Sequence, residues 1–64
     1  MIESTIIIEG LGVYRIEMFQ IPKEGDVLMF FDEQITLEVL SIKYILSYEY
    51  KKQTSVSIVC KIIN

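Results

Sequence analysis

Hydrophobic and polar side chains alternate with a period of two along most of this 64-residue chain. That period is typical of β-strands with one buried face, and no stretch shows the 3.6-residue spacing of an amphipathic helix. The composition agrees, because the chain has no alanine and is rich in isoleucine, valine, tyrosine, threonine and phenylalanine. We therefore predict an all-β domain with five strands, at residues 2–8, 13–19, 27–31, 34–50 and 54–63.

The predicted fourth strand changes the parity of its apolar positions in the middle. Odd positions are apolar up to Val39, and mainly even positions are apolar from Leu40 onward. Because successive side chains point to opposite faces of a sheet, this change requires a β-bulge or a sharp bend at Val39–Leu40. Two shorter strands with an irregular junction are the alternative, but no glycine, proline or asparagine interrupts the run. The predicted fold is a small five-stranded antiparallel barrel or strongly bent sheet, with residues 1–64 as a single domain.

The predicted fifth strand places a second apolar row opposite the fourth strand. Pairing even with even positions sets this row against Tyr44, Leu46 and Tyr48 and makes one continuous core face. The row on the fifth strand consists of Val56, Ile58, Cys60 and Ile62. The tyrosines are then core residues with their hydroxyl groups at the rim. We predict the turn between the two strands at 51–53, and strands one and five as candidate sheet edges.

The connection before the third strand contains the clearest turn signal. Pro22 and Gly25 favour a type I turn within residues 21–26. The third strand, at 27–31, is apolar at every position. Either both of its faces are covered by the protein, or one face meets a partner.

Charge is unevenly distributed along the chain. Residues 1–38 carry eight acidic and two basic side chains, whereas residues 39–64 carry four lysines and one glutamate. The molecule is therefore expected to be dipolar. Its net charge of −3 argues against a general nucleic-acid binder, because such proteins present a basic field.

A chain of this length has little margin for stability as a monomer. In a compact fold of about 4,200 Å² exposed surface, hydrophobic burial only balances the loss of conformational entropy. No covalent or metal staple is available, because Cys60 is the only cysteine and the chain has no histidine. The remaining sources of stability are an unusually apolar core and self-association, and the 52% hydrophobic content suits either.

No group of residues suits catalysis. Nucleophilic catalysis needs a base beside the nucleophile, but histidine is absent and Cys60 is expected in the core. The acidic residues at 24, 26, 32 and 33 belong to turns, where solvated carboxylates are common. We therefore predict no catalytic, cofactor-binding or metal-binding residues and no enzymatic activity.

Five apolar residues form the candidate interface. They are Ile45, Val59, Ile63, Leu28 and Phe30. A contiguous exposed apolar patch usually marks a contact site, and self-association would stabilise a marginal fold by mass action. We predict a non-catalytic protein-interaction module that forms a homo-oligomer, with a dimer favoured and edge-to-edge strand pairing as a plausible contact. A closed barrel that hides the same residues without a partner is the alternative.

The aromatic residues of the fourth strand support a different function. Tyr44, Tyr48 and Tyr50 could stack on bases or on a small ligand, and neighbouring lysines could contact phosphates. These lysines are Lys43, Lys51 and Lys52. A small-ligand or single-stranded nucleic-acid binder is therefore the alternative function, although the same face is also expected to supply the core.

The segment Ile21-Pro22-Lys23-Glu24-Gly25-Asp26-Val27, followed by a long strand and a hairpin, resembles small bacterial and phage proteins of the SH3-like β-barrel type. The resemblance implies a barrel strand that begins after an apolar-Pro-x-x-Gly-Asp-x turn. Such folds serve as adaptors, tail or capsid parts, inhibitors and nucleic-acid binders, so the fold alone assigns no function. One special case is a phage or mobile-element inhibitor that docks on a host protein through the acidic first half.

The first eight residues contain no basic segment, and their continuous apolar run is three residues long. These features suit neither a signal peptide nor a membrane span. We expect a cytoplasmic protein without a membrane partner.

Overall fold

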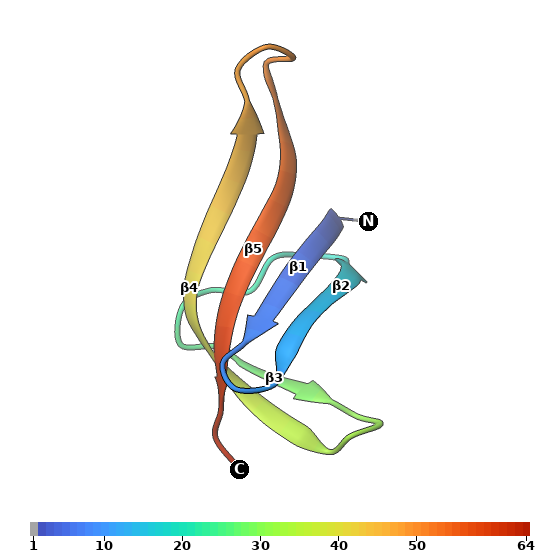
Figure 1. Ribbon diagram of the computed structural model, residues 1–64, viewed down its shortest axis with the longest axis vertical. Coiled ribbons are helices and arrows are strands. Elements are labelled where there is room, and N and C mark those ends of the chain that lie inside the picture. Colours follow the sequence, from blue (N-terminus) through green and yellow to red (C-terminus); the bar gives the residue numbers. More distant parts are fainter. Residues whose placement is uncertain (1) are drawn as a thin grey trace.

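The computed structural model describes residues 2–64 and contains five β-strands and no helix in that range (Figure 1). The strands are β1 (Ile2–Ile8), β2 (Gly12–Met18), β3 (Val27–Phe30), β4 (Ile35–Ser47) and β5 (Lys52–Ile62). They form one sheet in the order β2-β1-β5-β4-β3, which curls into a half-barrel. The predicted all-β class and the five predicted strands are confirmed. Residues 2–64 include no helix that is long and apolar enough to cross a membrane.

The sheet is mixed rather than purely antiparallel. β1 pairs in parallel with β5, while the other three pairings are antiparallel. The three antiparallel pairings join strands that follow one another along the chain, because a short connection reverses the direction between them. β1 and β5 are the first and last strands, so no short connection requires them to be antiparallel, and they pair in parallel.

β2 and β3 are the edges of the sheet, so the prediction that β1 and β5 are edges is wrong. β1 lies between β2 and β5, and β5 lies between β1 and β4. The run Thr5-Ile6-Ile7-Ile8 lacks charge because both sides of its backbone are paired and its even-numbered isoleucines are buried.

The β-bulge predicted at Val39–Leu40 is confirmed. On β4, Val39 pairs with Cys60 and Ser41 pairs with Val59, so Leu40 is an extra residue in the ladder. Before the bulge the odd-numbered Leu37 and Val39 face the core, and after it the even-numbered Ile42 packs against the core. Because β4 bends at the bulge, its first residues pair with β3 and its later residues follow the N-terminal part of β5.

The core is a single layer of aliphatic side chains on the inner face of the half-barrel. Its fully buried members are Ile6, Ile8, Leu37, Val39, Val56, Ile58 and Cys60. The only buried polar side chain among the described residues is that of Ser4, which lies on the same face of β1. Cys60 occupies the predicted core row, and burial raises the pKa of its thiol.

The turn before β3 is closed by two hydrogen bonds. The Asp26 N–H donates to the Lys23 carbonyl oxygen, and the Lys23 N–H donates to Asp26 Oδ2. Gly25 has a φ of 90°, and a positive φ at the third position is characteristic of a type II turn. The predicted turn is therefore present, but its type differs because Gly25, not Pro22, sets the geometry.

β4 and β5 extend well beyond the other strands (Figure 1). We call residues 43–55, the end of this two-stranded ladder and its turn, the hairpin arm. The turn spans 48–51 rather than the predicted 51–53, and Lys51 takes the left-handed conformation with a φ of 56°. A second bulge leaves Thr54 as the extra residue, and its hydroxyl donates to the Ile45 carbonyl oxygen.

The hairpin arm makes the molecule elongated. The principal extents are 41 × 19 × 19 Å and the radius of gyration is 12.2 Å, whereas a compact chain of this length has about 10.7 Å. The exposed surface is 4828 Å², roughly 600 Å² above the area of a compact protein of the same mass. Much of the apolar surface of this chain therefore stays in contact with solvent.

Candidate interaction surfaces

The hairpin arm contains no buried side chain, and every residue from 43 to 55 is described. Leu46 is 69% exposed, Tyr48 is 75% exposed and Tyr50 is 68% exposed. The cause is the absence of a third strand: β1 covers β5 only along Ser4–Ile8, opposite Val56–Cys60, and β3 covers β4 only along 35–38. The arm therefore presents large apolar side chains that the fold does not use.

We call residues 46–53 the tip of the arm. The tip combines exposed apolar side chains with positive charge. The Lys51 ammonium lies 3.8 Å from the centre of the Tyr48 ring, a cation–π contact. The Tyr50 N–H donates to Ser47 Oγ and orders the turn. The arm as a whole carries three lysines and one glutamate, whereas the rest of the chain carries eight acidic and three basic side chains. The dipole expected from the sequence thus divides the arm from the half-barrel.

The core row predicted on β4 and β5 ends where the arm begins. Tyr44 pairs with Val56 as expected, but Tyr44 is 53% exposed. Leu46 pairs with Gln53, and Tyr48 lies in the turn. The interpretation of Tyr44 and Tyr48 as core residues is wrong, because neither β1 nor β3 extends along the arm to bury them.

A cleft separates the two edges of the half-barrel. β2 and β3 run in opposite directions on either side of it, and the described residues form no backbone ladder between them. One aromatic contact crosses the gap: the rings of Tyr14 and Phe30 meet edge to face with centroids 5.4 Å apart. We call this space of about 360 Å³ the seam cleft. Its lining consists of Tyr14, Arg15, Ile16, Met29, Phe30, Phe31, Asp32 and Glu33.

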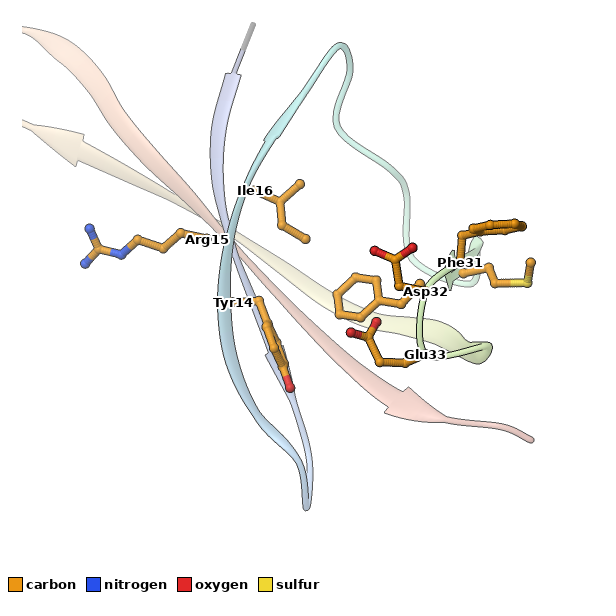
Figure 2. A pocket seen from close by; sticks show the side chains of 8 residues that line it. Tyr14, Arg15, Ile16, Phe31, Asp32 and Glu33 are labelled. Carbon is orange, nitrogen blue, oxygen red and sulfur yellow. The ribbon is translucent and has the colours of Figure 1, made fainter.

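The seam cleft is apolar inside and acidic at one rim. Figure 2 shows the carboxylates of Asp32 and Glu33 directed toward the cleft, across from Tyr14 and Ile16 on β2, whereas Arg15 points away to the other side of β2. On β3, Val27 and Met29 are exposed on the outer face. The apolar third strand is thus an edge strand with one face against the core and one face in solvent.

The five residues of the predicted interface do not form one patch. Leu28 and Phe30 lie on the inner face and pack against the core. Val59 lies on the outer face, whereas Ile45 is farther along that face in the arm, beyond the Lys43–Ser57 pair. Ile63 follows β5, where its N–H donates to the Thr36 carbonyl oxygen.

The six residues of the alternative ligand face are partly brought together. Tyr48, Tyr50, Lys51 and Lys52 gather at the tip, and a shallow depression is lined there by Tyr48, Lys51 and Lys52 together with Leu46, Ser47 and Gln53. Tyr44 and Lys43 are adjacent strand residues and therefore point to opposite faces of the arm.

Within residues 2–64, no cluster of three or more histidine, cysteine or acidic side chains is arranged to hold a metal ion. Cys60 is fully buried. Its raised pKa and its burial both lower the reactivity of the thiol. The Cys60 thiol is thus a packed core group and not an activated nucleophile.

Sequence reasoning did not identify the seam cleft or assign Leu46 to a surface. Met29 and Phe31 were signalled only by the continuous apolar run of the third strand. Leu46 follows the same alternation as the core residues of β4, so only the strand order shows that it is exposed. Comparisons with protein-family models, with curated proteins and with solved structures each found no match.

Proposed function

We propose that this protein is a non-catalytic protein-interaction module that self-associates through its hairpin arm. The observation that carries the proposal is the exposure of Tyr44, Leu46, Tyr48 and Tyr50 along a two-stranded ladder that no other strand covers. An isolated two-stranded hairpin is at best marginally stable in water. A partner that covers the arm would stabilise it and remove its apolar side chains from solvent.

Several features support self-association over a purely monomeric state. The exposed area exceeds that of a compact chain by roughly 600 Å². The fold has no disulfide, and the described residues hold no metal cluster. Association would therefore add stability that a single 64-residue core supplies only marginally.

Sedimentation velocity over a range of protein concentrations tests the proposal. The wild-type protein should approach twice the 7.5 kDa mass of the chain as the concentration rises. Leu46→Lys should remain a monomer, because a desolvated lysine at the contact is unfavourable. Val13→Lys is the matched control, since Val13 is 62% exposed and lies on the outer face of β2, away from the arm.

Two results would count against self-association through the arm. One is a wild-type protein that stays monomeric at high concentration. The other is an oligomer that Leu46→Lys leaves intact while Val13→Lys dissociates it. Ile45→Lys, on the opposite face of the arm from Leu46, then reports whether both faces of the arm are covered.

A single-stranded nucleic-acid binder is the second candidate function, and the exposure of the tip supports it. Tyr48 and Tyr50 are largely exposed and lie near Lys51 and Lys52 in the sequence and at the turn. Against it, Lys51 already covers one face of the Tyr48 ring, and the chain is acidic overall. Fluorescence anisotropy with a labelled oligothymidine tests it: salt-sensitive binding that Tyr48→Ala abolishes would favour this function.

The resemblance to SH3-like barrel proteins is part of the proposal. Its support is the position of the Lys23–Asp26 turn, which directly precedes β3 as the resemblance implies. A cytoplasmic location is likewise proposed, since the free thiol of Cys60 suits a reducing compartment.

A further inference from the structure

The tip of the hairpin arm and the seam cleft have complementary chemistry. The inside of the cleft is lined by the apolar side chains of Tyr14, Ile16 and Phe30. Its rim carries the carboxylates of Asp32 and Glu33, and Phe31, 80% exposed, lies beside it on the outer side of β3 (Figure 2). No salt bridge engages these two carboxylates among the described residues. The cleft is therefore suited to a partner that brings aromatic groups and positive charge together.

The tip supplies that combination. Leu46, Tyr48 and Tyr50 are its exposed apolar groups. Lys51 and Lys52 stand beside them at the end of the turn and the start of β5. Lysines next to aromatic rings can pair with carboxylates while the rings fill an apolar space.

The tip cannot enter the cleft of its own chain. The 48–51 turn lies at one end of the long axis, and the β3–β4 turn with Asp32 and Glu33 lies toward the other end (Figure 1). The long axis measures 41 Å, and both regions belong to the same continuous sheet. Only a second molecule can bring a tip to the cleft.

We propose that two copies pair side by side in opposite directions, each placing the tip of its hairpin arm in the seam cleft of the other. The inference rests on the proposed self-association and names the surface on which the arm docks. A two-fold axis between the copies makes each contact twice and closes the assembly at a dimer. The occupant of the cleft is therefore a second copy of this chain.

Electrostatics favour this antiparallel arrangement over a parallel one. The arm has a net charge of +2 and the remainder of the chain has −5. Two antiparallel copies set each positive arm against a negative half-barrel, whereas parallel copies would set arm against arm.

A charge-exchange experiment tests the docking directly. In one variant Lys51→Glu and Lys52→Glu make the tip acidic, and in the other Asp32→Lys and Glu33→Lys make the rim basic. Each variant alone should lose dimerisation by about a hundredfold, because like charges then face each other at both contacts. An equimolar mixture should restore a heterodimer, since both of its contacts join opposite charges. Circular dichroism checks that each exposed-site variant stays folded.

A matched variant separates specific docking from general attraction between charged molecules. Glu3→Lys with Glu17→Lys adds the same charge on the outer faces of β1 and β2, where the two residues form a cross-strand pair. It should dimerise like the wild type and should not rescue the variant with the acidic tip.

The outcomes distinguish the two proposals. Dimers that persist in both charge variants would overturn docking in the cleft and leave self-association standing. Rescue by the Glu3 and Glu17 variant would also overturn the docking, because net charge alone would then explain it. A wild-type protein that never dimerises would overturn both proposals.

Discussion

The half-barrel and the hairpin arm are built from the same two strands, yet only the half-barrel has a core. On β4, Leu37 is fully buried and Leu46 is 69% exposed, although both continue the alternation of apolar and polar residues. The difference is the number of neighbours: β3 and β1 flank the ladder at one end, and no strand flanks it at the other. In the arm, the apolar alternation continues where no further strand buries it, and this is the observation behind the proposed self-association.

Truncation of one aliphatic side chain in each region should separate the half-barrel from the arm most clearly. Ile58→Ala should lower the free energy of unfolding by about 2–5 kcal/mol, because it opens a cavity in the single core layer. Leu46→Ala should change it by less than about 0.5 kcal/mol under monomeric conditions. Urea denaturation at low protein concentration measures both. Equal losses would show that the arm shares the core.

A second prediction concerns the aromatic contact that crosses the seam. A double-mutant cycle with Tyr14→Leu and Phe30→Leu should give a coupling energy of about 1 kcal/mol, since the two rings meet edge to face. Thermal or urea unfolding of the four proteins provides the cycle. Additive single effects would mean that the two edges of the half-barrel do not support each other.

The two turns with left-handed residues allow a smaller, matched comparison. Gln34 has a φ of 55° and Lys51 a φ of 56°, which glycine adopts without strain. Gln34→Gly should raise the global stability by up to about 1 kcal/mol, because its turn joins two strands of the half-barrel. Lys51→Gly, made in the monomeric Leu46→Lys background, should slow amide exchange in the arm alone. Equal gains in global stability would contradict the separation of the two regions.

The smallest expected effect is on the pH dependence of stability. Burial raises the pKa of Cys60 in the folded state, so the unfolded chain ionises first as the pH increases. The contribution of Cys60 is constant below the ordinary pKa of a thiol, about 8.5, and decreases between that value and the raised pKa. The wild type should therefore lose stability relative to Cys60→Val as the pH rises above this point. If stability depends on pH in the same way in the two proteins, burial does not raise the pKa of Cys60 and the thiol is in contact with water.

Local patterns predicted the features that depend on neighbours in sequence. The period of two located five strands, and the parity change at Val39–Leu40 located the bulge, because both follow from the alternation of side chains along a strand. The strand order could not be obtained in this way. The parallel pairing of β1 with β5 and the open edges of β2 and β3 depend on how the ends of the chain meet in space.

The same limit applies to the interaction surfaces. Ile45 and Tyr48 could be selected from the sequence as candidate contact residues, but Leu28 and Phe30 could not be separated from the core. Tyr14 became a candidate only when the strand order placed β2 and β3 at the two edges of the sheet, with the seam cleft between them. Burial on a strand depends on the strands beside it, and a single sequence carries little information about those neighbours.

Amide hydrogen exchange at two protein concentrations shows whether a second copy covers the hairpin arm. If a second copy covers the hairpin arm, the amides of residues 43–55 should become more protected as the concentration rises, because no strand of the same chain shields the arm from solvent. The Leu46→Lys variant should show no such increase. Arm amides that are equally protected at both concentrations, in the wild type and in the variant, would contradict the account.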